Sequence, residues 1–230
     1  RALGGALDAG GRARLGLFDG TISLDLDASA RDLGVGEPAL DVLLAGESRV
    51  ALVAARDAQG SRIDRIEATS AALSASGSAA LSPEAGALAL RARLAVPPDL
   101  EARLTSPEAR QAAQALAALG GPVTLETEAD WAADAPLQLR RLALEGPGLR
   151  LTGAGQARPE ALTSSLTGEL SLALERLDRF AALAGRPLAG ALSATASARA
   201  EGAGEGAGGG REGEIALALA ARTRGLVLGL

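Results

Sequence analysis

Residues 21–31 read Thr-Ile-Ser-Leu-Asp-Leu-Asp-Ala-Ser-Ala-Arg, and apolar and polar side chains alternate through this stretch without interruption. Successive residues of a β-strand point to opposite sides, so Ile22, Leu24 and Leu26 would share one face and the serine and aspartate side chains the other. A helix would distribute the same polar residues around its circumference. The stretch therefore predicts a β-strand with one apolar and one polar face.

The same alternation recurs along most of the chain and predicts a mainly β fold, a curled, antiparallel-rich sheet of roughly ten strands that forms a β-groove. At Arg140-Arg141 the alternation slips by one residue, which predicts a β-bulge or a strand end. If all the strands present their apolar side chains to one side, the lining of this groove consists of Ile22, Leu24, Leu26, Val50, Leu52, Leu88, Leu90, Leu94, Val123, Leu125, Leu149, Leu151, Leu166, Leu170, Leu172, Leu174, Leu192, Ile215, Leu217 and Leu219.

Three segments carry helix signals instead, and we expect short helices at about 38–45, 107–119 and 177–184. The second is the clearest, because Ser106 is a favourable N-cap and Pro107 suits the first helical position. Each segment ends in a Leu-x-Gly sequence, and glycine is the usual residue just beyond a helix C-terminus.

An internal repeat is predicted by the order in which these signals recur. A helix, a glycine, alternating strands and a Pro-Glu turn follow one another twice, at an offset of about 76 residues. At this offset Arg65 matches Arg141, and Gly77 matches Gly153.

The repeat divides the chain into five parts. We expect 1–36 to be the end of a preceding β unit, 37–105 to be one repeat unit, and 106–201 to be a second unit with the start of the next strands. The glycine-rich residues 202–213 are expected to form a loop, and 214–230 to form further strands.

The composition excludes most catalytic chemistry. The chain lacks His, Cys and Lys, so it has no ordinary zinc or haem ligands, no thiol nucleophile, no Ser-His-Asp triad and no Schiff-base lysine. We expect no metal, no cofactor and no catalytic residue. The net charge is −5 and only 1% of the residues are aromatic, which also argues against nucleic-acid binding.

Paired carboxylates are the one catalytic device left, and they occur at Asp25/Asp27, Glu126/Glu128 and Asp130/Asp134. Such pairs could serve a hydrolase of the glycosidase type. They share their strand faces with serine and threonine, so nothing would separate the two pKa values. We interpret them as parts of solvated strand faces.

Few aromatic residues and much alanine predict a thin core, because burial contributes about 25 cal/mol per Å² and alanine offers little area. A sheet that curls without closing would leave its apolar face as an open aliphatic groove. Such a groove suits acyl chains, which need contact and no hydrogen bonds. A G/C-rich genome is an alternative origin of the same composition. Trp131 falls in phase with Val123 and Leu125 and is interpreted as a packing residue.

Residues 177–192 read Leu-Asp-Arg-Phe-Ala-Ala-Leu-Ala-Gly-Arg-Pro-Leu-Ala-Gly-Ala-Leu, which resembles a recurring unit of the TamB proteins: a short helix, Leu-Ala-Gly, x-Pro-Leu-x-Gly and a strand. TamB proteins belong to the AsmA-like, repeating β-groove superfamily. Residues 37–46 and 115–125 look like further units. The chain begins at Arg1 and ends within an alternating stretch, and we expect it to be an internal fragment of a longer protein.

The resemblance implies a periplasmic β-groove within a translocation and assembly module protein anchored in the bacterial inner membrane. It also implies an outer-membrane partner of the Omp85 type, similar to TamA. The implied role is outer-membrane biogenesis, through transport of phospholipid acyl chains or through assembly and secretion of outer-membrane proteins. A structural spacer or adhesin-like repeat with a closed core and no ligand is the alternative reading of the same alternation.

Overall fold

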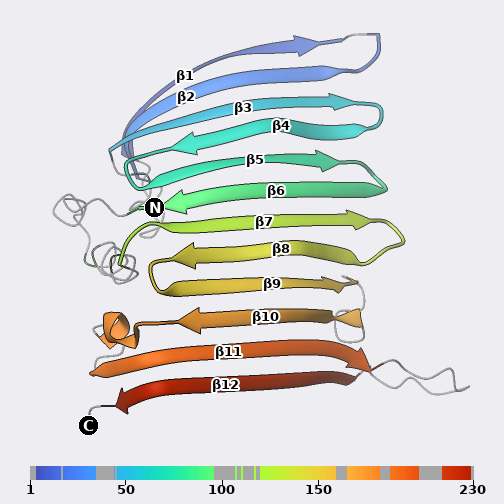
Figure 1. Ribbon diagram of the computed structural model, residues 1–230. Helices are drawn as coiled ribbons and strands as arrows, with labels where there is room; N and C mark the ends of the chain where they lie inside the picture. The colour runs from blue at the N-terminus through green and yellow to red at the C-terminus, as the bar shows by residue number, and fades with distance from the viewer. Residues whose placement is uncertain are drawn as a thin grey trace, which may run out of the picture.

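The computed structural model describes residues 4–16, 18–34, 44, 46–95, 107, 110, 117, 120–158, 165–181, 187–201 and 214–228. Within these ranges the chain forms one open antiparallel sheet of twelve strands, whose order in the sheet is their order in the sequence (Figure 1). The strands are β1 (Gly4–Leu15), β2 (Ile22–Gly34), β3 (Glu47–Asp57), β4 (Gly60–Thr69), β5 (Leu73–Leu81), β6 (Ala85–Leu94), β7 (Val123–Ala132), β8 (Leu137–Gly146), β9 (Leu149–Ala157), β10 (Thr167–Leu174), β11 (Leu188–Glu201) and β12 (Glu214–Leu228).

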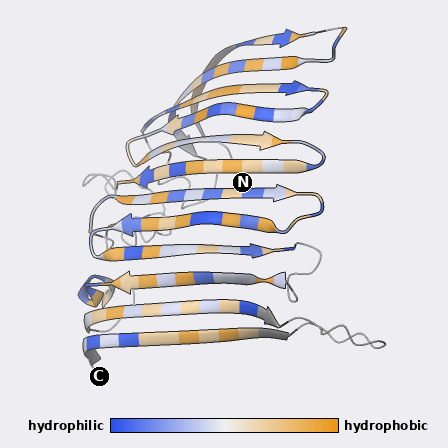
Figure 2. Cartoon of the chain, turned by 45° about the vertical axis from the view of Figure 1, so that its right-hand side comes forward, coloured by the Kyte–Doolittle hydropathy of each residue, from blue (hydrophilic) through white to orange (hydrophobic). Residues whose placement is uncertain are grey.

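Hydropathy changes repeatedly along individual strands, where apolar and polar bands follow one another (Figure 2). Tight turns join several of the strands. In the β3–β4 turn, Oδ1 of Asp57 accepts hydrogen bonds from the backbone N–H groups of Gln59 at 2.8 Å and Gly60 at 3.1 Å. An aspartate that bonds its own backbone in this way stabilises a turn. Strands joined by such turns, for example β3 and β4, lie directly beside each other as antiparallel partners.

Two β-bulges, in β4 and β8, interrupt the middle of the ladder without inverting the faces of the sheet, and two further register shifts lie near strand ends in the β1–β2 and β11–β12 pairs. In β4, the pairing with β3 shifts between Ile63 and Arg65. In β8, the pairing with β7 shifts between Leu139 and Arg141. Each bulge inserts one extra residue, Asp64 in β4 and Arg140 in β8, so the apolar residues on both sides of it stay on the same face. The bulge predicted at Arg140-Arg141 is confirmed.

The same offset separates several structural features. The two inserted residues are 76 positions apart, and β9 (Leu149–Ala157) occupies the positions of β5 (Leu73–Leu81) shifted by the same 76. Gly77 pairs with Ile66 beyond the first bulge, and Gly153 pairs with Leu142 beyond the second. The bulge and the strand that follows it thus recur as a unit, although the unit boundaries proposed from the sequence stay predictions.

Few apolar residues are fully buried in the described part of the chain. They are Val123 and the four alanines Ala72, Ala92, Ala143 and Ala157. Apart from the short 3-10 helix η2 (Leu177–Phe180), which packs against β11, the main contacts of each strand are with its neighbours in the sheet. A single sheet layer leaves larger side chains partly open to solvent, because burial requires a second layer.

The sequence-based fold class is confirmed: the described chain is mainly β, antiparallel and open, with almost no helix. Of the helix expected at 177–184, the structure describes η2 and Ala181. The helices expected at about 38–45 and 107–119 lie outside the described residues except at four helical positions, as does the expected loop at 202–213. The four positions are Leu44, Pro107, Arg110 and Ala117.

The bulge predicts a specific effect of deleting Arg140. The deletion removes the inserted residue, so Leu137 and Leu139 move to the polar face, whereas Arg140→Ala keeps the insertion and loses only the arginine side chain. We expect the deletion to lower the free energy of unfolding by about 1–3 kcal/mol and Arg140→Ala by less than about 1 kcal/mol. Urea unfolding followed by far-UV circular dichroism measures both. Equal losses would show that the inserted residue does not maintain the faces.

Candidate functional site: the aliphatic face of the sheet

One face of the sheet carries an unbroken apolar row. Starting from Gly11 in β1, each residue of this row pairs with the next one across all twelve strands, and Thr127 is its only polar member. The row consists of Gly11, Leu26, Leu52, Ile66, Gly77, Leu90, Thr127, Leu142, Gly153, Leu170, Ala196 and Leu219. We call the side of the sheet that contains this row the aliphatic face, and the opposite side the polar face.

The pairing register brings the residues predicted to line a groove together on the aliphatic face. Eighteen of the twenty lie in strands at positions whose side chains share this face with the row. Leu166 directly precedes β10 and lines the same surface. Ile215 has the matching backbone position, opposite Ala200 in the β11–β12 pair.

Many large side chains on this face are exposed. The most open belong to the edge strands, where Leu217 and Leu219 of β12 are each 76% exposed. Among the described residues, all the exposed large hydrophobic side chains lie on the aliphatic face except Phe18, which is in the β1–β2 turn. Soluble monomers rarely expose apolar patches larger than a few hundred Å². An aliphatic surface carried over twelve strands therefore favours a bound apolar partner.

The aliphatic face is hollowed over β8 to β12, where a depression of about 520 Å³ opens. Three glycines, Gly153, Gly155 and Gly168, form part of its floor. A Cβ atom on Gly153 would lie 2.9 Å from Cδ1 of Leu170, and one on Gly155 would lie 2.8 Å from the backbone oxygen of Thr167. Because these glycines have no side chains, the depression is deeper at this point. Its walls include Leu137, Leu139, Leu142, Leu166, Leu170, Leu217 and Leu219.

The polar face holds a cross-strand ladder of ion pairs. Glu126 of β7 lies between two arginines, with Oε1 2.6 Å from Nη2 of Arg91 and Oε2 2.8 Å from Nη2 of Arg141. Arg140 donates hydrogen bonds from Nε and Nη2 to both carboxylate oxygens of Asp130. These hydrogen bonds hold the pKa of Asp130 below its usual range. Both bulge arginines thus pair with carboxylates of the neighbouring strand.

The predicted carboxylate pairs lie on the polar face or in a turn. Asp25 is opposite Arg12 and Asp27 is opposite Gly10 in the β1–β2 pair, whereas Asp134 lies in the β7–β8 turn and does not share a strand with Asp130. Within the described ranges, no three Asp or Glu side chains gather where they could hold a metal ion. Of the six predicted carboxylates, Glu126 and Asp130 form ion pairs with arginine.

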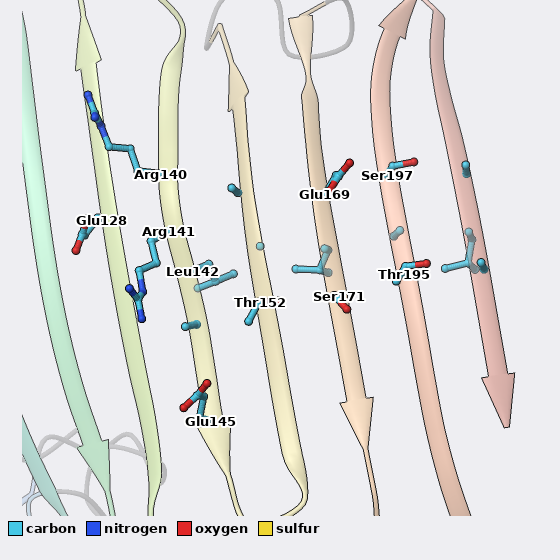
Figure 3. Close-up of a pocket in the computed structure, with 18 residues that line it drawn as sticks. Glu128, Arg140, Arg141, Leu142, Glu145, Thr152, Glu169, Ser171, Thr195 and Ser197 are labelled. Atoms are coloured by element: carbon cyan, nitrogen blue, oxygen red, sulfur yellow. The ribbon is translucent and has the colours of Figure 1, made fainter. Parts of the chain in front are cut away.

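A second depression, of about 860 Å³, lies on the polar face over β7 to β12. All six of these strands contribute to its lining, with Arg140 and Arg141 near Glu128 at one side and hydroxyl groups toward the other (Figure 3). Sequence reasoning missed this feature. The signal was the consecutive pair Arg140-Arg141, because a bulge turns both residues to the same face. The remaining labelled polar residues are Glu145, Thr152, Glu169, Ser171, Thr195 and Ser197.

Comparisons with protein-family models, with curated proteins and with solved structures gave no match. Among the described helical residues, none belongs to a helix with the length and apolar character needed to cross a membrane.

Trp131 offers a probe of the aliphatic face. Its ring lies over Gly86 of β6, so a Cβ atom on Gly86 would be 2.0 Å from Cζ2 of the indole. We expect Gly86→Ala to displace the ring, shift its fluorescence emission to longer wavelength and cost about 1–3 kcal/mol of stability. Gly10→Ala is the matched control, because a Cβ atom there meets nothing within 4 Å. An unchanged emission spectrum for Gly86→Ala would contradict the stacking.

Proposed function

We propose that this chain is a periplasmic segment of a TamB-like envelope-biogenesis protein, and that its aliphatic face carries phospholipid acyl chains between the inner and outer membranes. One observation supports the proposal above all others: an exposed aliphatic face runs through all twelve strands, while the charged residues with pairing partners in the described strands, Arg56 excepted, occupy the opposite face. Acyl chains match such a face because they require apolar contact and no polar partner.

The dimensions of the face suit more than one lipid. Neighbouring strands are about 4.8 Å apart, so a sheet of twelve strands is about 50 Å wide across the strands. Burial of each methylene group contributes about 0.8 kcal/mol. A lipid that moves from one strand to the next exchanges one set of aliphatic contacts for a similar set, so the free energy of binding changes little along the sheet. Nearly uniform contact of this kind favours movement over tight storage.

The polar face supports the same proposal from the other side. Arg91, Glu126 and Arg141 form a ladder across β6, β7 and β8. Charges on this face keep one side of the sheet in water, and the difference between the two faces determines which one an acyl chain contacts.

The resemblance of residues 177–192 to a TamB unit supports the cellular setting. In this proposal the chain is part of a longer protein anchored in the bacterial inner membrane, and that protein contacts an outer-membrane partner of the Omp85 type, similar to TamA. The same face could also receive apolar strands of outer-membrane proteins during their assembly or secretion. A spacer or adhesin-like module is the competing function, and it requires that something closes over the aliphatic face.

Photocrosslinking from neighbouring residues tests the proposal. A photoreactive amino acid replaces Leu90 or Leu172 on the aliphatic face, with Ala89 and Ser171, their neighbours on the polar face, as controls. In a Gram-negative periplasm we expect phospholipid adducts at the two leucine positions and few at the controls. Equal labelling of both faces, or no lipid adduct at any position, would contradict the proposal and favour a closed spacer.

An arginine on the aliphatic face should interrupt it. We expect Leu172→Arg to reduce the phospholipid that copurifies with the chain by about tenfold or more, because a charge in an apolar contact loses its hydration. Ser171→Arg adds the same charge to the polar face and should leave the lipid content unchanged. Far-UV circular dichroism shows whether each variant keeps its sheet. Equal lipid loss in two folded variants would contradict the assignment of faces.

A further inference from the structure

One charged residue interrupts the aliphatic face. Among the charged residues that have a pairing partner in the described strands, Arg56 alone occupies a position on this face, opposite Ile22 of β2 and Ser61 of β4. The other charged residues with pairing partners lie on the polar face. At the border of an aliphatic surface, an arginine can lay its methylene groups on the apolar side chains and keep its guanidinium in water, where it can pair with an anion.

The guanidinium of Arg56 has no hydrogen bond or ion pair with any described residue. The nearest carboxylate along the chain, Asp57, is already used: its Oδ1 accepts two backbone hydrogen bonds in the β3–β4 turn, and its Oδ2 lies 3.8 Å from Nη1 of Arg62. Arg56 is exposed. An exposed and uncompensated guanidinium at an apolar border is well suited to an anion.

Arg56 lies at the margin of the aliphatic face, at the end of the strands where the β1–β2, β3–β4, β5–β6 and β7–β8 turns are located (Figure 1). The residues that pair across the sheet at this margin form a row, which also contains Ser61 and Trp131, the only tryptophan of the chain. Arg, Ser and Trp have polar tips suited to a boundary between an apolar surface and water. The row as paired across the sheet is Leu15, Ile22, Arg56, Ser61, Leu81, Gly86 and Trp131.

We propose that Arg56, together with the hydroxyl of Ser61, binds the phosphate of a glycerophospholipid whose acyl chains lie along the aliphatic positions of β2, β3 and β4. This inference rests on the proposed function. The planar guanidinium donates two parallel hydrogen bonds to phosphate oxygens, a geometry that a lysine ammonium does not offer.

The length of the strands fits this orientation. From Arg56 the aliphatic side chains continue inward through Ala54 and Leu52 of β3, beside Leu24 and Ile63 of the neighbouring strands. A strand of eleven residues such as β3 is about 36 Å long, which exceeds the length of an ordinary acyl chain. A lipid with its phosphate at the margin can therefore keep its chains on the face, with the headgroup in water.

Isothermal titration of the 230-residue chain with two short-chain lipids tests this site. The probes are dihexanoyl phosphatidylglycerol, which has a phosphate, and dihexanoylglycerol, which has the same chains and none. We expect Arg56→Gln to weaken binding of the first by about tenfold and to leave binding of the second within about twofold. Arg56→Lys keeps the positive charge but loses the two parallel N–H donors of the guanidinium, and it should give an intermediate loss of affinity for the first lipid.

The control is Arg49→Gln, which removes an arginine from the polar face of the same strand. It should leave both affinities unchanged, and circular dichroism should show native spectra for all variants. An equal loss in Arg49→Gln and Arg56→Gln would overturn the phosphate site and indicate only general charge attraction. Glycerol 3-phosphate bound as tightly as the phospholipid would overturn its assignment to lipid. If both lipids bind and Arg56→Gln changes neither affinity, the phosphate site is wrong, but lipid binding by the aliphatic face is supported. If neither lipid binds, the proposed function itself is wrong.

Discussion

The in-phase pairing of neighbouring strands is the constraint on which the rest of the structure depends. Side chains alternate with a period of two, so a slip of one residue in any strand pair would send every apolar side chain of the following strand to the polar side. The register avoids this through eleven successive antiparallel pairs, and one apolar row runs from Gly11 to Leu219. Both faces of the molecule, and any function assigned to them, follow from this one regularity.

The two bulges show how the constraint is kept where the sequence changes phase. In β8, Leu139 and Leu142 are three positions apart and would face opposite sides in a regular strand. The extra residue restores their common face and places Arg140 and Arg141 together on the other side, where they pair with Asp130 and Glu126. The ion pairs are exposed or half-buried and contribute modestly to stability. Their larger effect is on position, because two adjacent charges mark the face that stays in water.

A single layer has a consequence for both stability and function. The described chain buries little beyond alanine and Val123, so its strands are held chiefly by backbone hydrogen bonds and by contacts between neighbours on the same face. The aliphatic side chains that a second layer would cover remain open. Such a molecule buries less apolar area than a globular domain does, and it has a continuous exposed surface on which an apolar ligand can bind and move.

The sequence alone determined the chemistry of each face and much of the sheet. Strict alternation in residues 21–31 and 123–130 identified β2 and β7, and the phase slip located the bulge in β8. Alternation did not identify β1, β4 and β5. The glycine-rich stretch of β1 and the serine- and alanine-rich stretch of β5 alternate too weakly, and the bulge in β4 hides its period. Only the tertiary structure decided which residues meet across strands: the position of Arg56 among aliphatic neighbours, Glu126 between two arginines, and the glycine floor of the apolar depression. Alternation is a property of one strand, whereas these juxtapositions depend on the register between strands, which no single stretch of sequence encodes.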